Sequence, residues 1–418
     1  MLAGIEYGRD LPHAAHASRV FSDIFLRLIK CIVAPLIFGT LVTGIAGHGS
    51  SANNAGDSSI GRLGWKSLLY FEVLTTAALA IGLFAINVSH AGVGVALPAQ
   101  ATISPASTAT GMGSWQDFLL RVFPANLAQA VATDQILEVA VFALLFGLAL
   151  NRVPAPRRAP MLALVESLTE TMFAFTNLVM YLAPLGVGAA LAYTVASAGV
   201  GVMANLGRLL VTLYLALLAF VVLAMLPAAL IARIPIRAFL KAVAEPATIA
   251  FATSTSEAAL PRAMEAMEAF GVPRRITGFV IPAGYSFNLA GSALYLAIAS
   301  VFVAQAAGQH LGWRRQVAML LVLMLTSKGV AGVPRAVLVV LLATAGTFHL
   351  PEGPIFLILG IDALMDMGRT VINVTGNCLA AAVIARWEGV FGTELPAPET
   401  LAEPAQPHAA SDSMPVRM

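Results

Sequence analysis

Two stretches of sequence, TSTSEAALPRA at residues 253–263 and TSKGVAGVPRA at residues 326–336, decide the fold. In each, a Thr-Ser pair is followed, after six further residues, by Pro-Arg-Ala, and the stretch interrupts an apolar segment. This pattern is typical of two short half-helices joined by a polar tip. Backbone that leaves a helix at membrane depth must line a cavity or be buried in protein. The pair therefore predicts two re-entrant helical hairpins, and their matching places indicate inverted repeats around a transport site.

The hairpins alternate with long apolar segments that carry polar and glycine residues in their middle. Asn288-Leu-Ala-Gly291 follows the first hairpin, and Asn373-Val-Thr-Gly376 follows the second. We expect a break in the helix at both places. The order of a hairpin followed by a broken helix then occurs twice in the chain.

The composition is that of a membrane protein. Of the 418 residues, 58% are hydrophobic and only 11% are charged, too few to cover a soluble surface. A membrane span needs about 20 mostly apolar residues. The clear spans before the first hairpin are residues 21–46, 65–88, 161–195 and 206–232, with a further apolar helix ending near residue 150. The span at 161–195 is too long to cross upright, so we expect it to be tilted or broken.

Three other features follow from composition. Polar residues 48–62 and the proline- and arginine-rich residues 151–160 are expected to form loops. Residues 1–19 show no cleavable signal peptide, and residues 393–418 are expected to be a disordered tail. The net charge of +2 indicates no nucleic-acid partner.

The distribution of basic residues predicts the orientation in the membrane. The connections at residues 91–115 and 196–205 contain no lysine or arginine. The connections that alternate with them carry Arg62, Lys66, Arg152, Arg157, Arg158, Arg233, Arg237 and Lys241. This alternation places the basic connections, and the C-terminus, on the cytoplasmic side of a bacterial-type inner membrane. Arg314 and Arg315 do not fit the pattern.

Four segments resemble those of one transporter family. They are residues 21–47, TSTSEAALP at 253–261, PAGYSFNLAG at 282–291 and DMGRTVINVTGN at 366–377. Over roughly residues 1–390 the chain resembles the dicarboxylate/amino acid:cation symporter family. Within that family, LYFE at residues 69–72, TSKGVAGVP at 326–334 and the Gly376-Asn377 pair look closest to the bacterial proton-coupled glutamate/aspartate branch.

The resemblance implies an all-α membrane protein with the glutamate-transporter-like fold. That fold has about eight transmembrane helices, two re-entrant hairpins and inverted repeats. The resemblance also implies a homotrimer in the lipid membrane. A scaffold domain holds the trimer, and a transport domain carries substrate across like an elevator.

The same resemblance divides the chain into segments. The scaffold would comprise residues 1–60, whose first ten residues resemble the last turns of a truncated first helix, and residues 91–205. The transport domain would comprise a third helix at 61–90, a sixth at 206–235, hairpin 1 at 236–275, a broken seventh helix at 276–312, hairpin 2 at 313–353 and an eighth helix at 354–392.

Arg369 is the first candidate for binding substrate. A charge at the bilayer centre costs at least about 2.5 kcal/mol, so it is rarely there without a partner. The planar guanidinium matches a carboxylate, and the resemblance makes Arg369 the ligand of the substrate's side-chain carboxylate. The alternative is a permanent structural pair with Asp366 or Asp362.

The neighbours of Arg369 indicate the class of substrate. By resemblance, Asp366 binds the substrate's α-amino group. Thr370 and Asn373 would hydrogen-bond its carboxylates, Asn373 the α-carboxylate in particular. A plain C4-dicarboxylate has no ammonium to pair with an aspartate. Asp366 therefore favours glutamate or aspartate as the substrate.

The hairpin tips would complete the binding site. Ser254, Thr255 and Ser256 offer hydroxyls and free backbone N–H groups at a half-helix N-terminus, which suit a carboxylate. In the second hairpin the resemblance implies Gly332 and Val333, within a tip that acts as the extracellular gate. Arg335 stands there where the family usually has glycine.

The residues expected to couple transport to a cation are unusual. The resemblance places Gly284, Asn288 and Asn377 at this site. Ala290 stands where the family has a carboxylate, and Asn377 replaces a second one. Sodium needs oxygen ligands, mostly carboxylates, carbonyls and hydroxyls. The sequence therefore disfavours sodium coupling and predicts no metal ligand set.

A proton needs only one buried carboxyl group. The candidates are Glu72, Glu257 and Asp362, of which Glu72 is the most isolated acid in an apolar stretch. The co-transported ion is thus expected to be H+ or Na+, with H+ favoured, and no further cofactor is expected.

The sequence therefore predicts a secondary active symporter that imports glutamate or aspartate together with cations, chiefly protons. One alternative is a C4-dicarboxylate symporter, which Asp366 disfavours. Another is a non-transporting sensor or anion leak, which the substitution at Ala290 favours. No nucleophile–base set or metal cluster lies at helical spacing, so an enzyme is not expected. Cys31 and Cys378 lack metal-ligand spacing and are expected to be buried.

Overall fold

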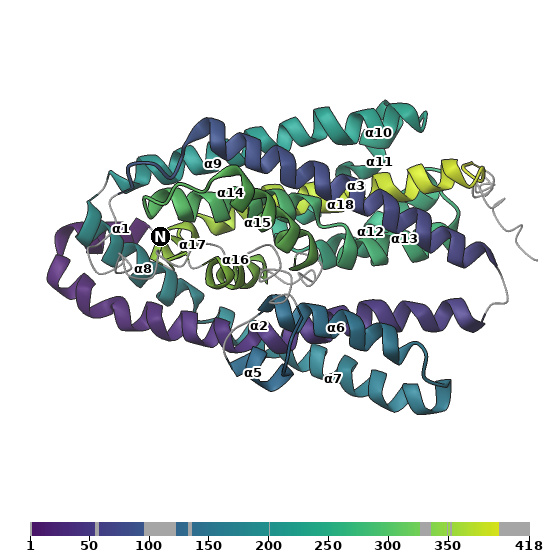
Figure 1. Cartoon of the computed structure of the whole chain (residues 1–418). Helices are drawn as coiled ribbons and strands as arrows, with labels where there is room; N and C mark the ends of the chain where they lie inside the picture. The colour runs from purple at the N-terminus through teal and green to yellow at the C-terminus, as the bar shows by residue number, and fades with distance from the viewer. Residues whose placement is uncertain are drawn as a thin grey trace, which may run out of the picture.

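The structure, a computed structural model, describes residues 2–54, 58–95, 123–132, 136–199, 201–326, 336–348, 350–351 and 353–392. Every regular element in these ranges is a helix (Figure 1). Within them, the segments long and apolar enough to cross a membrane are Arg62–Ser89, Val202–Ile231 and Arg274–Ala306. The protein is an all-helical, multi-pass membrane protein. Gly332, Val333 and Arg335 of the expected second hairpin tip, and the expected tail at 393–418, lie outside the described residues.

One side of the molecule is built around the long helix α2 (Figure 1). Its helices are α1 (Leu2–Asp10), α2 (Pro12–Asn54), α5 (Leu127–Ala132), α6 (Ile136–Leu150), α7 (Ala155–Met180) and α8 (Ala183–Ala198). Helix α2 packs against α6, α7 and α8. A Cβ atom at Gly39 would collide with the hydroxyl of Thr169, so glycine is what lets α2 and α7 approach closely.

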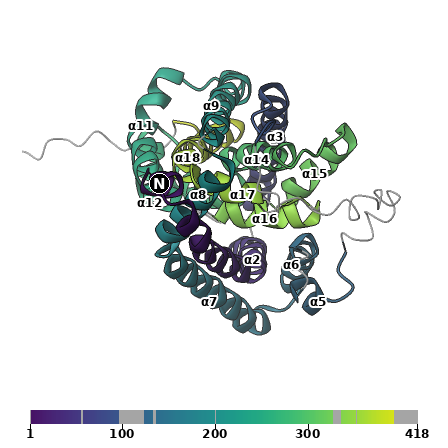
Figure 2. The same cartoon turned by 90° about the vertical axis from the view of Figure 1, so that its left-hand side faces the viewer.

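The other side holds the remaining helices, with α14 and α18 at its centre (Figure 2). They are α3 (Ser58–Ser89), α9 (Val202–Phe220), α10 (Leu226–Ile231), α11 (Ile236–Thr253), α12 (Ser256–Ala269), α13 (Arg274–Phe287), α14 (Ala290–Ala306), α15 (Trp313–Thr326), α16 (Ala336–Thr347), α17 (Gly353–Leu359) and α18 (Asp362–Trp387). A single π-helical turn, Val221–Met225, joins α9 to α10. Pro227 follows it, and its missing N–H group accounts for the irregular turn. Every residue of α14 except Gln305 is buried, so this helix is the core of this side.

The structure agrees with the expected first hairpin. Helices α11 and α12 pack against each other and are joined only by Ser254 and Thr255. Ser254 adopts a left-handed conformation with φ of 53°, which reverses the chain. Both helices also pack against α18. For the second hairpin, the two arms α15 and α16 are described and contact each other, which agrees with the expected arrangement.

The break in the seventh helix is also confirmed. Helix α13 ends at Phe287 and α14 begins at Ala290, with Asn288 and Leu289 in non-helical conformations between them. The long span at 161–195 is broken as well, because α7 ends at Met180 and α8 begins at Ala183.

The expected break at Asn373–Gly376 is wrong. Helix α18 runs without interruption from Asp362 to Trp387, and the chain breaks earlier, at Gly360 and Ile361. The reason is that the Asn373 side chain bonds to α14 and not to its own backbone, so it does not compete with the helix.

Three smaller expectations are also wrong. Helix α2 continues to Asn54 and α3 begins at Ser58, so most of the expected loop at 48–62 is helical. Helix α7 begins at Ala155, because proline near the first helical position costs no hydrogen bond, and this shortens the expected loop at 151–160. Cys31 is exposed on α2, whereas Cys378 is buried as expected.

Candidate functional site

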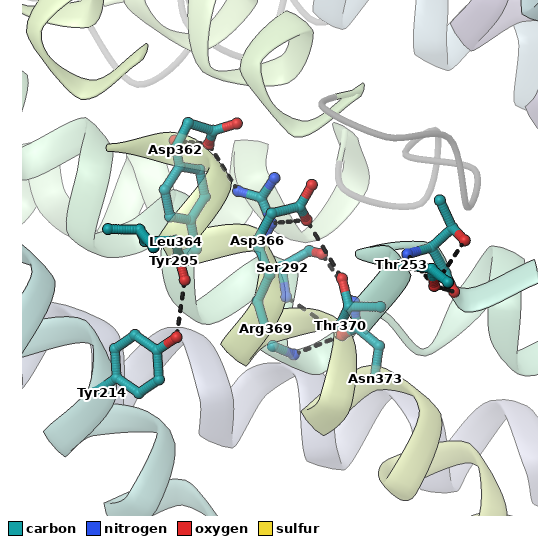
Figure 3. Close-up of polar contacts among 12 residues, drawn as sticks. Tyr214, Thr253, Ser292, Tyr295, Asp362, Leu364, Asp366, Arg369, Thr370 and Asn373 are labelled. Atoms are coloured by element: carbon teal, nitrogen blue, oxygen red, sulfur yellow. Dashed lines mark hydrogen bonds and ion pairs between the residues drawn. The ribbon is translucent and has the colours of Figure 1, made fainter. Parts of the chain in front are cut away.

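A fully buried arginine lies at the centre of the helical core. Arg369 on α18 is 1% exposed and is the largest fully buried side chain described. Its Nε donates to Asp366 Oδ1 at 2.7 Å, and its Nη1 donates to Asp362 Oδ1 at 3.2 Å (Figure 3). The three side chains lie on one face of α18 because they are spaced by three and four residues. The ion pairs with Asp366 and Asp362, which a purely structural role for Arg369 requires, are therefore present.

These ion pairs leave part of the cluster unused. Arg369 Nη2 is buried and has no hydrogen-bond partner in the part of the chain that the structure describes. Asp366 uses Oδ1 for both Arg369 and the hydroxyl of Thr370, and no described residue donates to its Oδ2. The cluster thus contains an unpaired guanidinium N–H group and, on the neighbouring Asp366, a carboxylate oxygen without a described donor. A buried charged donor without an acceptor is costly, which favours an anionic ligand there.

Tyr295 of α14 closes the cluster on its other side. The phenol donates to Asp362 Oδ1 at 3.2 Å, and its ring lies 4.4 Å from the Arg369 guanidinium carbon. Such a cation–π contact in a desolvated place is worth about 2 kcal/mol. Tyr295 and Asp362 are both fully buried. Tyr295 therefore holds the arginine and the deeper aspartate in fixed positions.

Asn373 connects the cluster to the broken helix. Its Oδ1 accepts from the backbone N–H groups of Gly291 at 2.9 Å and Ser292 at 3.3 Å. Its Nδ2 donates to the Ser292 hydroxyl at 3.0 Å. Asn373 thereby caps the N-terminus of α14. Its expected role in binding substrate stays a prediction. A Cβ atom at Gly291 would collide with the Arg369 carbonyl oxygen, so the helices touch at this point.

The first hairpin tip presents polar groups beside α18. Thr253 Oγ1 accepts from the Thr255 backbone N–H at 3.3 Å and from the Thr255 hydroxyl at 3.1 Å. Thr255 is the N-cap of α12 but forms no side-chain cap, so the first N–H groups of α12 have no side-chain partner from it. Ser256 follows, buried in the first turn. Thr255 and Ser256 therefore form a helix N-terminus suited to an anion, and Ser254 ends the preceding helix α11.

The predicted cation residues also come together, but without a charge. Asn288 Nδ2 donates to Asn377 Oδ1 at 2.8 Å, and a Cβ atom at Gly284 would collide with the Asn377 amide. Asn288 Oδ1 and Asn377 Nδ2 are buried and have no hydrogen-bond partner within the described ranges. Ala290 is buried at the start of α14. Among the described residues, no three His, Cys, Asp or Glu side chains are grouped as metal ligands.

The three proton candidates lie in different surroundings. Asp362 is in the buried cluster with Arg369. Glu72 is half-buried on α3, where its backbone carbonyl accepts from the Thr76 hydroxyl at 2.7 Å. Glu257 is exposed in the first turn of α12. Only Asp362 contacts the arginine.

Two residues of the site were missed in the sequence. Tyr295 and Ser292 lie four residues and one residue after Gly291, at the start of α14. The helical spacing from the predicted break could have suggested them, because residues four apart share a helix face. Nothing in the sequence paired them with Asp362 and Asn373, which are 67 and 81 residues away.

The arrangement as a whole defines a class of protein. A helical hairpin and a broken helix meet a buried, charged cluster in the middle of a multi-pass membrane protein, and such sites belong to secondary transporters. The chain belongs to the sodium:dicarboxylate symporter family, whose model matches residues 1–387. Members of this family are transporters and not enzymes.

Several characterised proteins are similar over most of their length. The proton/glutamate-aspartate symporter of Escherichia coli (strain K12) is 40% identical over 376 residues, covering 88% of this chain and 85% of that protein. The proton/sodium-glutamate symport protein of Bacillus subtilis (strain 168) is 42% identical over 375 residues, covering 88% and 86%. The C4-dicarboxylate transport protein of Pectobacterium atrosepticum is 41% identical over 389 residues, covering 92% and 89%.

Proposed function

We propose that this protein is a proton-coupled symporter that imports glutamate and aspartate across a bacterial inner membrane. By the family resemblance it works as a homotrimer, in which the segment of α3 and α9 to α18 moves as an elevator against a scaffold. The C-terminus lies in the cytoplasm. The similarity to the proton/glutamate-aspartate symporter of Escherichia coli supports the choice of substrate and ion.

One observation carries the choice of substrate. Arg369 keeps a buried, unpaired Nη2, and Asp366 keeps an oxygen without a described donor beside it. An acidic amino acid presents a carboxylate to the first and an ammonium to the second. Both contacts are charge-assisted hydrogen bonds, which are about twice as strong as neutral ones.

The remaining contacts follow from the geometry. The substrate's side-chain carboxylate binds Arg369, and its ammonium binds Asp366. Its α-carboxylate is then directed to the hairpin tip, where the N-terminus of α12 offers backbone N–H groups. Asn373 orients this site indirectly, because it holds the start of α14 against α18.

The neutral cation residues support protons over sodium. The pair Asn288–Asn377 and the apolar Ala290 supply no carboxylate. Sodium sites rely on charged and carbonyl oxygens, whereas a proton needs one carboxyl group, which the buried cluster has.

The C4-dicarboxylate reading remains the second candidate, because a C4-dicarboxylate transport protein is also 41% identical. A dicarboxylate would satisfy Arg369 but would bring a second carboxylate towards Asp366. The repulsion between like charges makes this substrate the weaker choice.

The test is uptake of labelled aspartate into proteoliposomes, with a pH gradient in one arm and a sodium gradient in the other. Accumulation with the pH gradient alone is expected. Accumulation only with sodium would overturn the proton assignment. Binding of aspartate without accumulation in either arm would support a sensor or leak, and succinate outcompeting aspartate would support the dicarboxylate reading.

A further inference from the structure

We propose that Asp362 is the group that holds the coupled proton. This inference rests on the proposed function and names the place of the proton within it. It starts from the formal charges of the buried cluster, where one guanidinium faces the two carboxylates of Asp362 and Asp366. These three side chains, when ionised, carry a net formal charge of −1.

Substrate binding makes this balance worse. Glutamate and aspartate carry two carboxylates and one ammonium, so they add one further negative charge. The neighbouring residues that could hold a compensating cation, Ala290, Asn288 and Asn377, are neutral in this chain. A buried charge without a partner costs several kcal/mol. A proton taken up with the substrate removes that cost.

The geometry selects Asp362 over Asp366. Asp366 must remain ionised to bind the substrate's ammonium, and its Oδ1 already accepts from Arg369 and Thr370. Asp362 is fully buried, and its bond to Arg369 is the longer of the two, 3.2 Å against 2.7 Å. When a substrate carboxylate binds the guanidinium, the longer bond is the one expected to be given up.

Tyr295 can form a hydrogen bond with Asp362 in either protonation state. A phenol can both donate and accept a hydrogen bond. In the structure Tyr295 donates to Asp362 Oδ1. Once Asp362 is protonated, its O–H group can donate to the phenol oxygen instead. Either protonation state of Asp362 is therefore satisfied by the same neighbour.

Charged and titratable side chains from two helices lie around Asp362. Arg369 and Asp366 come from α18, and Tyr295 comes from α14. Tyr214 of α9 donates to the Leu364 backbone carbonyl of α18 at 2.8 Å. The helix that precedes α18, α17, contains no titratable side chain.

In the proposed cycle, each proton taken up on one side of the membrane is released on the other. In the empty state Asp362 is ionised and paired with Arg369. Substrate and one proton from the same side bind together, the proton on Asp362 and the carboxylate on Arg369. After the substrate leaves on the other side, Arg369 returns to Asp362 and the proton is released there. One proton crosses for each substrate through this group.

The test is the number of protons taken up when aspartate binds. Purified protein is titrated with aspartate by calorimetry in buffers of different ionisation enthalpy. The wild type is expected to take up about one proton near neutral pH. Asp362→Asn imitates the protonated carboxyl group, so this variant is expected to bind aspartate with almost no proton uptake. In vesicles it is expected to exchange aspartate across the membrane without accumulating it. The matched control is Glu265→Gln, an exposed acid paired with Arg262 on α12, which should behave as wild type.

Each outcome decides between the proposals. Wild-type binding without proton uptake would overturn proton coupling itself. Proton uptake that persists in Asp362→Asn, or that disappears in Glu72→Gln or Glu257→Gln instead, would overturn only the assignment to Asp362. If Asp362→Asn does not fold, Tyr295→Phe gives the second test. Removing the phenol, which serves both protonation states, should narrow the pH range of proton uptake by about 0.5–1 unit at each end, and an unchanged range would overturn the proposal.

Discussion

The side-chain amide of Asn288 donates to Asn377 Oδ1 at 2.8 Å across the break between α13 and α14. The two residues are 89 positions apart, yet they form a buried pair with no charge. The other two amide atoms, Asn288 Oδ1 and Asn377 Nδ2, have no hydrogen-bond partner among the described residues. The pair is therefore polar enough to hold the helices together, but it lacks the carboxylate that a sodium ion prefers.

Restoring carboxylates here should restore a response to sodium. We expect the double variant Ala290→Asp with Asn377→Asp to bind aspartate more tightly when sodium is added, whereas the wild type does not respond. The measurement is aspartate affinity at several sodium concentrations, with potassium as the balancing ion. Ala290→Asn with Asn377 unchanged is the control for size. An unchanged sodium profile in the double variant would show that this place does not bind the ion.

Replacing Arg369 should abolish substrate binding. Arg369→Ala removes the carboxylate ligand and leaves the fully buried Asp362 without its cation, a change that costs about 3–5 kcal/mol in stability. Uptake of aspartate is expected to fall to background. The double variant Arg369→Gln with Asp362→Asn separates the two effects, because it removes the unpaired charge and should recover stability without recovering uptake. Uptake near wild-type level in either variant would refute the binding role.

Asp366 should distinguish amino acids from dicarboxylates. Asp366→Asn removes the charge that we assign to the substrate's ammonium, while Thr370 and Arg369 stay in place. A hydrogen bond to a charged group is worth about 1.5–3 kcal/mol, so aspartate affinity should fall about 10- to 150-fold. Succinate has no ammonium and should lose much less. Competition binding with both ligands measures the difference, and equal losses would contradict the ammonium role.

The contact between Gly291 and Arg369 gives a prediction about stability. Gly291→Ala would place a methyl group against the Arg369 backbone carbonyl, which cannot move as a side chain can. Overpacking of this kind costs about 1–3 kcal/mol. Gly278→Ala on α13 is the matched control, because a Cβ atom there meets open space. That change should be neutral or stabilising by up to about 1 kcal/mol. Thermal unfolding in detergent compares the two, and equal shifts would contradict the close contact.

Glu388, which lies outside the membrane-spanning helices, gives a prediction about how stability depends on pH. Just beyond the end of α18, its carboxylate accepts from Lys66 at 2.6 Å and from Arg62 at 2.9 Å. The hydrogen bond from Lys66 is the largest cause that lowers the pKa of Glu388 below its ordinary value. A lowered pKa in the folded state means that the pair stabilises fully above the ordinary glutamate pKa of about 4.3 and is lost as pH falls below it.

The melting temperature of the wild type should therefore fall more steeply below about pH 5 than that of Glu388→Gln. The exposed ion pair between Glu265 and Arg262 at the first hairpin provides the control. Glu265→Gln changes an exposed pair and should leave the acid dependence unchanged. Parallel curves for the wild type and Glu388→Gln would show that this pair contributes nothing.

The sequence by itself determined the class of protein and the break at Asn288, and it predicted a hairpin where α11 and α12 are joined. These are local properties: an apolar run, and the polar or glycine residues that interrupt it, are read within a window of about 20 residues. It also identified Arg369 and Asp366, because an arginine in an apolar helix has to be explained wherever it lies.

Only the tertiary structure decided what those residues contact. Asn373 resembled a helix break in the sequence, but it caps α14 from 82 residues away, and α18 is continuous for that reason. Tyr295 was not a candidate until the fold brought it to Asp362, 67 residues on. Such contacts depend on how the broken helices pack. A buried polar group stabilises the fold only when its hydrogen-bond partner is in place, and that partner comes from a distant part of the chain.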